Sequence, residues 1–173
     1  MLGTGPSERL PANEAARQLL CGFLRRAFRR PPTDGEVERY SAVAKEALKA
    51  GDSFDLAVRK ALKPVLVSPH FLLRVETTPT SKDKDLRISD HELAVRLSYF
   101  LGSTMPDDEL FALADKGTLS QPENLEKQVR RMLAHPRATA LTSQFLTQWL
   151  QMPHLQKALP TQNQFPTYSR NPA

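Results

Sequence analysis

Histidine and cysteine are the residues of this sequence that could bind a transition metal, and histidine could also transfer protons near neutral pH. A zinc site on one helical face needs two histidines four residues apart. The histidines here are scattered, and the single cysteine, Cys21, allows neither an internal disulfide nor a c-type haem attachment motif. We therefore expect neither haem nor stoichiometric zinc, and we interpret the histidines as turn and surface residues: His70, His91, His135 and His154.

Carboxylates are the second group that could do chemistry, and Asp107, Asp108 and Glu109 form a cluster suited in composition to acid–base catalysis. Consecutive residues of a helix point in different directions, however, and acids at a helix start are stabilised by the macrodipole. We therefore expect this cluster to stabilise a helix start. Cys21 has no histidine beside it in the sequence to activate its thiol, so no nucleophile is predicted.

Arginines are the third group. The pairs Arg25–Arg26 and Arg29–Arg30 could bind phosphate or an acidic surface. They also fall where a helix ends, and basic side chains there complement the carbonyl end of the macrodipole. We favour this structural role for both pairs.

Arg96 lies on a predicted helix that is apolar on nearly every side, as a central helix would be. We expect it to be buried or half-buried and paired with an acid, since an unpaired charge there is costly; the candidates are Glu92, Glu76 and Asp107. His91, in the first turn of the same helix, is interpreted as solvated and neutral. No catalytic, cofactor-binding or metal-binding residue is predicted. A cluster in one pocket of these residues would instead favour an enzyme: Asp107, Glu92, Arg96 and His70.

The elements that position these residues are predicted to be helices. The chain has 173 residues, of which 40% are hydrophobic and 25% charged, and its apolar residues recur at intervals of three and four. This pattern predicts an all-α fold, an orthogonal or bundle-like array of about eight helices in two subdomains. We place the first at 12–76, a polar linker at 77–88, the second at 89–152 and an irregular tail at 153–173. Predicted helix caps are Asn13, Thr33, Ser68, Ser89 and Ser120.

Prolines and glycines predict where helices stop. Pro64 should kink or end the third helix because proline lacks a backbone donor and crowds the preceding turn. Gly51, Gly102 and Gly117 are placed to close three others. A circular dichroism spectrum rich in helix and poor in strand is expected.

The charge and hydropathy of the chain argue against a nucleic-acid partner and against a membrane span, but they do not select a function. The net charge of +5 and the isoelectric point near 9.6 reflect basic residues that are spread along the chain, which makes nucleic acid an improbable partner. No apolar run is long enough for a membrane span, and the first residues do not form a signal peptide.

The last predicted helix carries a wide apolar stripe that earlier helices can cover only in part. We expect an exposed apolar patch there, through which the chain would bind other domains of a longer parent protein or its own copies. The stripe consists of Ala138, Leu141, Phe145, Leu146 and Trp149.

Two sets of segments resemble known families. The strings RRAFRRP (25–31) and LVSPHFLLRVE (66–76) resemble domain of unknown function 1595. The later strings resemble the N-terminal part of domain of unknown function 1592, and they follow in that family's order: ELAVRLSYFL (92–101), MPDDEL (105–110), MLAHPRA (132–138) and FLTQWL (145–150). Gly102 departs from the pattern, since a tryptophan is usual there.

The resemblance implies a large exported bacterial protein, mainly of planctomycetes and some myxobacteria, in which these modules follow a c-type haem domain. It implies a periplasmic or extracellular location and assigns no catalytic residue. The leading hypothesis is a non-catalytic helical module that packs against other domains, with this chain a piece of the whole. The alternatives are an incomplete hydrolytic or redox enzyme acting on extracellular polymer, and a basic module that binds an acidic polymer or nucleic acid.

Overall fold

The computed structural model describes residues 10–74, 76 and 88–152 of the chain. These residues form helices and contain no β-strand, so the predicted all-α fold is confirmed. The elements in chain order are α1 (Ala12–Phe28), α2 (Asp34–Lys49), α3 (Phe54–Leu66), α4 (Pro69–Leu72), α5 (Asp90–Gly102), α6 (Asp108–Asp115), α7 (Pro122–Ala134), the 3-10 helix η1 (Pro136–Ala138), the π-helix η2 (Leu141–Leu146) and α8 (Thr147–Trp149).

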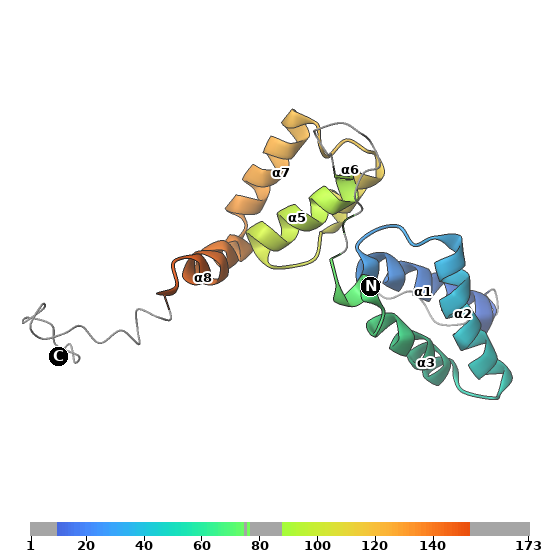
Figure 1. Ribbon diagram of the computed structural model, residues 1–173. Coiled ribbons are helices and arrows are strands. Elements are labelled where there is room, and N and C mark those ends of the chain that lie inside the picture. The colour runs from blue at the N-terminus through green and yellow to red at the C-terminus, as the bar shows by residue number, and fades with distance from the viewer. Residues whose placement is uncertain (1–9, 75, 77–87, 153–173) are drawn as a thin grey trace, which may run out of the picture.

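The helices gather in two groups, which Figure 1 shows side by side. In the first, here called the N-terminal half, α1, α2 and α3 pack against one another and α4 contacts α1 and α3. In the second, the C-terminal half, α5 packs against α6, α7, η1 and η2. The predicted linker at 77–88 and tail at 153–173 lie outside the described residues, except for residue 88.

Side-chain caps fix most of the helix starts. Thr33 and Ser89 each form a complete capping box, with Glu36 and Glu92 respectively, as predicted. Ser68 accepts a hydrogen bond from the amide of His70 at the start of α4, which confirms that cap as well. These local bonds satisfy backbone donors that have no partner within the helix.

Two predicted starts are wrong. Asn13 lies inside α1, which begins at Ala12 after Pro11 and has no side-chain cap. Ser120 does not cap α7, whose cap position is held by Gln121. Pro122 explains the second difference, because its fixed φ and missing N–H suit it to the first position of a helix and place the start directly before it.

The predicted helix ends also need two corrections. Pro64 does not end α3, which continues to Leu66; Val65 is fully buried, and this burial holds the last turn although one backbone hydrogen bond is lost. α5 includes Gly102, and the left-handed residue that ends it is Ser103, with φ of 47°. Gly51 and Gly117 have positive φ after α2 and α6, as expected.

The N-terminal half closes a core of its own. Two clusters join its three long helices: one around Leu24, Phe28, Tyr40 and Val65, the other around Leu20, Ala44 and Ala61. The C-terminal half has one smaller cluster around Ala94, Leu110, Ala114 and Leu119, which belong to α5, α6 and the turn after α6. The core of the chain is therefore concentrated in α1–α3 and α5–α6.

α5 contacts four elements of its half, yet it is not surrounded. Ala94, Ser98 and Leu101 are its buried residues, whereas Arg96 and Phe100, one turn apart, face solvent. The prediction of a helix covered on all sides is therefore wrong for this face. Some of the apolar residues of α5, such as Phe100, therefore lie on a side of the helix that the other described elements cover only in part.

Candidate functional site

A large hollow lies where the two halves meet. It is a cavity of about 710 Å³, within the range of pockets that hold small organic ligands. Both halves contribute to its lining, the N-terminal half through the end of α1 and the residues around α4, the C-terminal half through the first two turns of α5. Its lining consists of Phe28, Arg29, Arg30, Pro31, His70, Leu73, Arg74, Glu76, Ser89, His91, Glu92, Val95 and Arg96.

Arg29 organises the wall of this cavity. It follows α1 in the left-handed conformation, with φ of 59°, which is unusual for a residue other than glycine. Its guanidinium donates to the carbonyls of His70 at 3.2 Å, Phe71 at 2.8 Å and Leu73 at 3.4 Å, and its Nε donates to the Tyr99 hydroxyl at 3.1 Å. One arginine therefore ties the end of α1 to α4 and to α5.

Arg30 is held next to it by a two-pronged ion pair. Its two terminal nitrogens donate to the carboxylate of Glu36 at 2.9 and 2.7 Å. These hydrogen bonds lower the pKa of Glu36 to about 2, helped by the capping amide of Thr33 and opposed by burial. His70 lies against the Phe28 ring, with 5.3 Å between ring centroids, and its Nε2 is 3.8 Å from Glu36.

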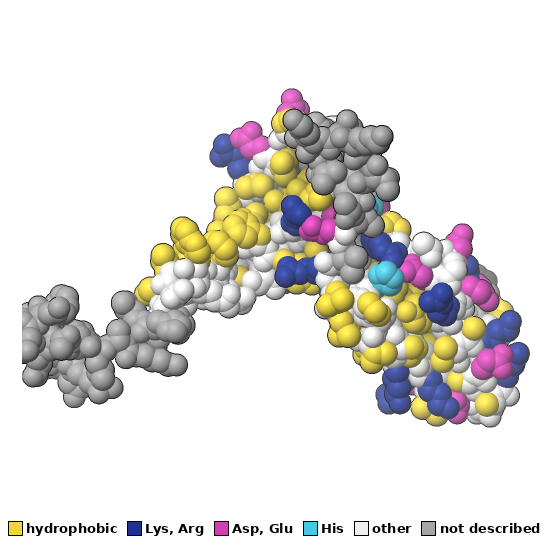
Figure 2. Space-filling view, viewed as in Figure 1, with side chains coloured by type: hydrophobic (Ala, Val, Ile, Leu, Met, Phe, Trp, Pro, Cys, Tyr) yellow, Lys and Arg dark blue, Asp and Glu magenta, His cyan; other side chains and the backbone are white. Residues whose placement is uncertain are grey.

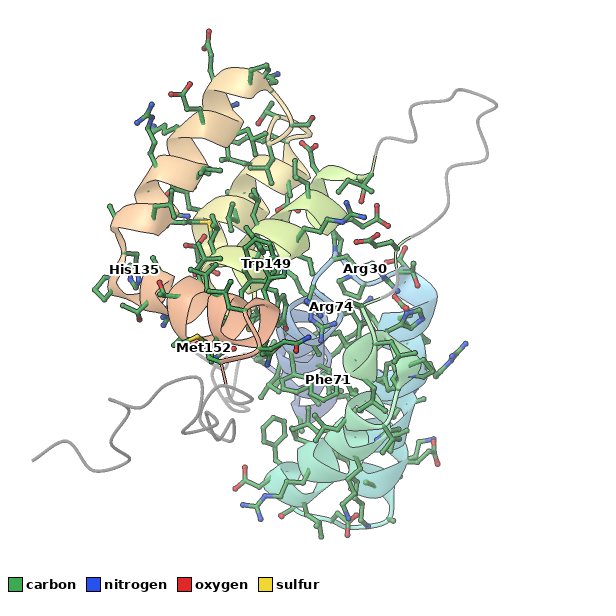
Figure 3. The ribbon with its side chains drawn as sticks, turned by 60° about the vertical axis from the view of Figure 1, so that its left-hand side comes forward. Arg30, Phe71, Arg74, His135, Trp149 and Met152 are labelled. Atoms are coloured by element: carbon green, nitrogen blue, oxygen red, sulfur yellow. The ribbon has the colours of Figure 1, made fainter. Side chains whose placement is uncertain are left out.

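Arg74 approaches the cavity from the residues after α4. Its guanidinium carbon lies 4.8 Å from the centre of the Tyr99 ring, and that of Arg29 lies 5.7 Å from the same centre. Figure 3 shows Arg74 and Arg30 at the junction of the two halves. Among the described residues, no carboxylate lies within ion-pair distance of Arg74 or Arg29. Two guanidinium groups thus share one aromatic ring without a paired acid.

Arg96 lies on the rim of the cavity, where its side chain is 56% exposed. The expected burial is therefore wrong, although the expected ion pair exists: Nε and a terminal nitrogen donate to Glu76 at 2.6 and 2.5 Å. Arg96 hydrogen bonds are the main reason why the pKa of Glu76 is lowered, with a smaller contribution from the charge of Arg74. The pair sits at the solvent edge because the outer face of α5 is open.

His91 also lines the cavity, and it is only partly solvated, whereas a solvated side chain was expected. Its ring is 21% exposed, and Nε2 lies 3.0 Å from Oδ1 of Asp115 at the end of α6. Asp115 also accepts a hydrogen bond from Arg25 at 2.5 Å, which is the main cause of its lowered pKa. The three side chains connect α1, α5 and α6.

The first arginine pair joins the two halves. Arg25 lies over the ring of Phe111 at 5.0 Å, in addition to its bond with Asp115, and Arg26 is 3.5 Å from Asp108. Its expected role was local, as basic side chains at the carbonyl end of α1. The structure adds contacts with residues about ninety positions later, which the sequence pattern of one helix does not reveal.

The acidic cluster has structural partners throughout. Asp107 caps α6 by accepting from the amide of Leu110 and also binds both terminal nitrogens of Arg131. Burial raises its pKa, but the bonds from Arg131 and Leu110 outweigh this effect, so its pKa is lowered. Glu109 accepts from the buried amide of Gln128 at 2.7 Å. The helix-start role expected for the cluster is confirmed for Asp107.

The four residues whose convergence would favour an enzyme are therefore brought together only in part. His70, Glu92 and Arg96 line the large cavity, whereas Asp107 lines a separate hollow of about 50 Å³ beside Arg131. Glu92 serves the capping box of α5, and Arg96 is bound to Glu76.

The remaining candidates lie elsewhere. Cys21 is exposed on α1. His135 is an exposed turn residue, as predicted, and its Nδ1 accepts from the amide of Arg137 to cap η1. His154 lies outside the described residues. In the parts of the chain that the structure describes, no group of three or more metal-binding side chains occurs, and no helix is long and apolar enough to cross a membrane.

A second feature of the surface is a row of aromatic rings on the C-terminal half. Phe100 of α5 meets Phe145 of η2 edge to face at 5.1 Å, and Phe145 stacks on Trp149 of α8 at 6.1 Å. The exposed fractions of these residues are 51%, 43% and 69%. Figure 2 shows the hydrophobic side chains as a band that runs from α8 toward α7. We call the three rings of Phe100, Phe145 and Trp149, together with the exposed apolar residues that follow them in the chain, Leu150 and Met152, the aromatic face.

The predicted stripe is present but not on one regular helix. Pro136 begins a 3-10 turn and the chain continues through the wider turns of a π-helix, so the apolar residues from Ala138 to Trp149 span three short elements. Sequence reasoning found Phe145 and Trp149. It missed the contribution of Phe100, which one-face periodicity on α5 could not separate from core residues.

Comparisons with known proteins agree with this two-part all-α architecture. Residues 15–76 match the family described as PSD5, Protein of unknown function (DUF1595), and residues 88–172 match PSD4, Protein of unknown function (DUF1592). The two matches together cover most of the chain, and they follow one another in the order that the sequence resemblance predicts. No curated protein and no solved structure matches this chain.

Proposed function

We propose that this chain is a non-catalytic helical module, made of subdomains at 12–76 and 89–152, whose aromatic face packs against another helical domain of the same parent protein. One observation carries the proposal. From Ser120 to Met152 the only buried side chain is that of Gln128, although this stretch contains many apolar residues. Such a stretch normally buries its apolar side against a neighbour, because helices gain most of their stability from packing.

The aromatic face has the composition of a protein contact. Aromatic residues and methionine are enriched at interfaces, and a fully covered tryptophan often contributes a large share of the binding free energy. Trp149, the single tryptophan of the chain, lies at the end of the row. The rings contact one another, one pair edge to face and the other stacked, so they are already ordered and lose little conformational freedom on binding.

The parent protein is proposed from the family. This chain resembles a family of exported bacterial proteins that also carry a c-type haem domain. Membership of such a protein would place this module in the periplasm or outside the cell. Within such a protein the module would hold its neighbours in a fixed arrangement. The chemistry would then belong to the other domains.

The two alternatives have weaker support. His70, Glu92 and Arg96 share a cavity, as an enzyme would require, but Glu92 and Arg96 are engaged in a helix cap and an ion pair. An acidic polymer or nucleic acid needs a continuous basic surface. Six arginines that could form one are already paired with acids: Arg25, Arg26, Arg30, Arg96, Arg130 and Arg131.

Trp149 provides the test. The chain should bind a hydrophobic dye, and Phe145→Ser or Trp149→Ser should remove most of that binding. Leu56→Ser is a matched control, because Leu56 and Phe145 have the same exposed fraction of 43% but lie in different halves. Addition of the domain encoded beside this module in the parent gene should shift Trp149 emission to shorter wavelengths and protect it from acrylamide.

Equal dye binding by the control and the two variants would contradict the proposal. So would Trp149 emission that remains fully open to acrylamide when all flanking domains are present.

A further inference from the structure

The packing function proposed above does not explain the charge of the cavity between the halves. Its lining includes four arginines and two glutamates, so its formal charge is +2 when the histidines are neutral. Arg30 and Arg96 are each neutralised by a carboxylate. The partner of Arg30 is Glu36, which lies outside the lining, so the net charge is +1 once Glu36 is counted. Arg29 and Arg74, the two arginines beside the Tyr99 ring, outnumber the remaining carboxylate of the lining, that of Glu92, and supply this excess.

The hydrogen bonds of these arginines distinguish them further. Arg29 uses its Nε and both terminal nitrogens to bind three backbone carbonyls and the Tyr99 hydroxyl, so it holds the wall. In the described structure, Arg74 makes a ring contact with Tyr99 but donates no hydrogen bond to a neighbouring group. A guanidinium in this state offers a planar fork that matches a carboxylate or phosphate.

The rest of the lining indicates what accompanies the anionic group. Phe28, Pro31, Leu73 and Val95 supply an apolar surface, and the cavity is much larger than a simple ion requires. His70 and His91 add two polar groups within the same lining.

We propose that this cavity binds a small organic anion, with one carboxylate or phosphate on the Arg74 guanidinium and an apolar or aromatic body against Phe28, Leu73 and Val95. Both halves of the chain supply lining residues, so the ligand would contact both of them. The site is separate from the aromatic face, and either assignment can fail without the other.

The test is a titration of the full chain with benzoate and with phenyl phosphate, followed by calorimetry and by the NMR signals of labelled tyrosine. Benzamide is the neutral control ligand. We expect saturable binding of one anion per chain and at least tenfold weaker binding of benzamide. The Tyr99 signals should shift more than those of Tyr40, which is buried in the N-terminal core and reaches the cavity lining through its edge contact with Phe28. The anion that binds more tightly identifies the source as carboxylate or phosphate.

Arg74→Gln should weaken binding of the preferred anion at least tenfold. Arg59→Gln, which removes the same charge from an exposed position on α3, should leave it within twofold. The proposal is overturned by the absence of saturable anion binding, by equal affinity for benzamide, or by equal losses in the two variants. The tyrosine signals of the unaltered chain decide the question even if Arg74→Gln does not fold.

Discussion

The two halves of this chain bury their apolar residues to different extents. In the N-terminal half, three long helices enclose Leu20, Leu24 and Val65 completely. In the C-terminal half, α5 and α6 enclose Leu110 and Leu119, but from Ser120 to Met152 every residue except Gln128 remains half-buried or exposed. A stretch of thirty or so residues thus forms helices without completing a core.

This difference separates local from tertiary stability. Both halves have well-capped helices, so capping alone does not decide whether a core closes. What differs is the number of long helices that meet: α1, α2 and α3 cover one another, whereas α7 covers only one side of α5. The open side is where we place the partner domain.

The largest effect should come from the closed core. Leu24→Ala should lower the free energy of unfolding by about 3 to 5 kcal/mol, because it leaves a cavity in a fully buried cluster. Leu150→Ala, at a residue that is 60% exposed, should cost less than about 1 kcal/mol. Denaturant unfolding measures both, and a similar cost for the two changes would remove the contrast between the halves.

The next effect concerns Glu36. Its pKa is lowered to about 2 by Arg30, so the ionised form stabilises the fold at pH values above the ordinary glutamate pKa. This contribution, at most about 3 kcal/mol, is lost as the pH falls from about 4.5 to 2. Glu36→Gln should destabilise the chain at pH 7 and flatten the acid limb of its stability profile.

Glu38→Gln is the control for that experiment, since Glu38 is an exposed acid on the same helix. If Glu36→Gln left the acid limb unchanged, the ion pair with Arg30 would not stabilise the N-terminal half.

A smaller effect is expected at the seam between the halves. The coupling energy of Arg25 and Asp115, measured by a double-mutant cycle with Arg25→Gln and Asp115→Asn, should be about 0.5 to 1 kcal/mol because both side chains are about one-third exposed. It should decrease in salt. The pair Arg130–Glu126, within one helix and more exposed, serves as reference and should couple more weakly.

A seam pair that couples no better than this reference would mean that Arg25 does not help to hold the halves together. If Arg25 does help to hold the halves together, both Arg25→Gln and Asp115→Asn should raise the rate of amide hydrogen exchange in α6.

The smallest effect should come from Arg96. A buried cation would make Glu76→Gln much more harmful than Arg96→Met, but both side chains are largely exposed. We expect the two variants to unfold within experimental error of the unaltered chain. A large loss in Glu76→Gln alone would show that Arg96 is desolvated after all.

Much of the fold could be predicted because its signals are local. The capping boxes at Thr33 and Ser89 and the left-handed glycines Gly51 and Gly117 act within four or five residues of their own position. Predictions failed where a distant contact overrode a local preference. Pro64 stays within α3 because Val65 is buried, and His91 is partly covered because Asp115 lies beside it.

The sequence by itself determined the helical class and the order of the two segments that match family models, since helix periodicity, capping and sequence motifs depend on neighbours along the chain. Only the tertiary structure decided which charges meet. Arg25 reaches Asp115 across ninety positions and Arg29 reaches Tyr99 across seventy, and no residue pattern specifies such pairs. The cavity beside Arg74 and the aromatic face exist for the same reason: both arise where helices that are distant in sequence come together or fail to cover one another.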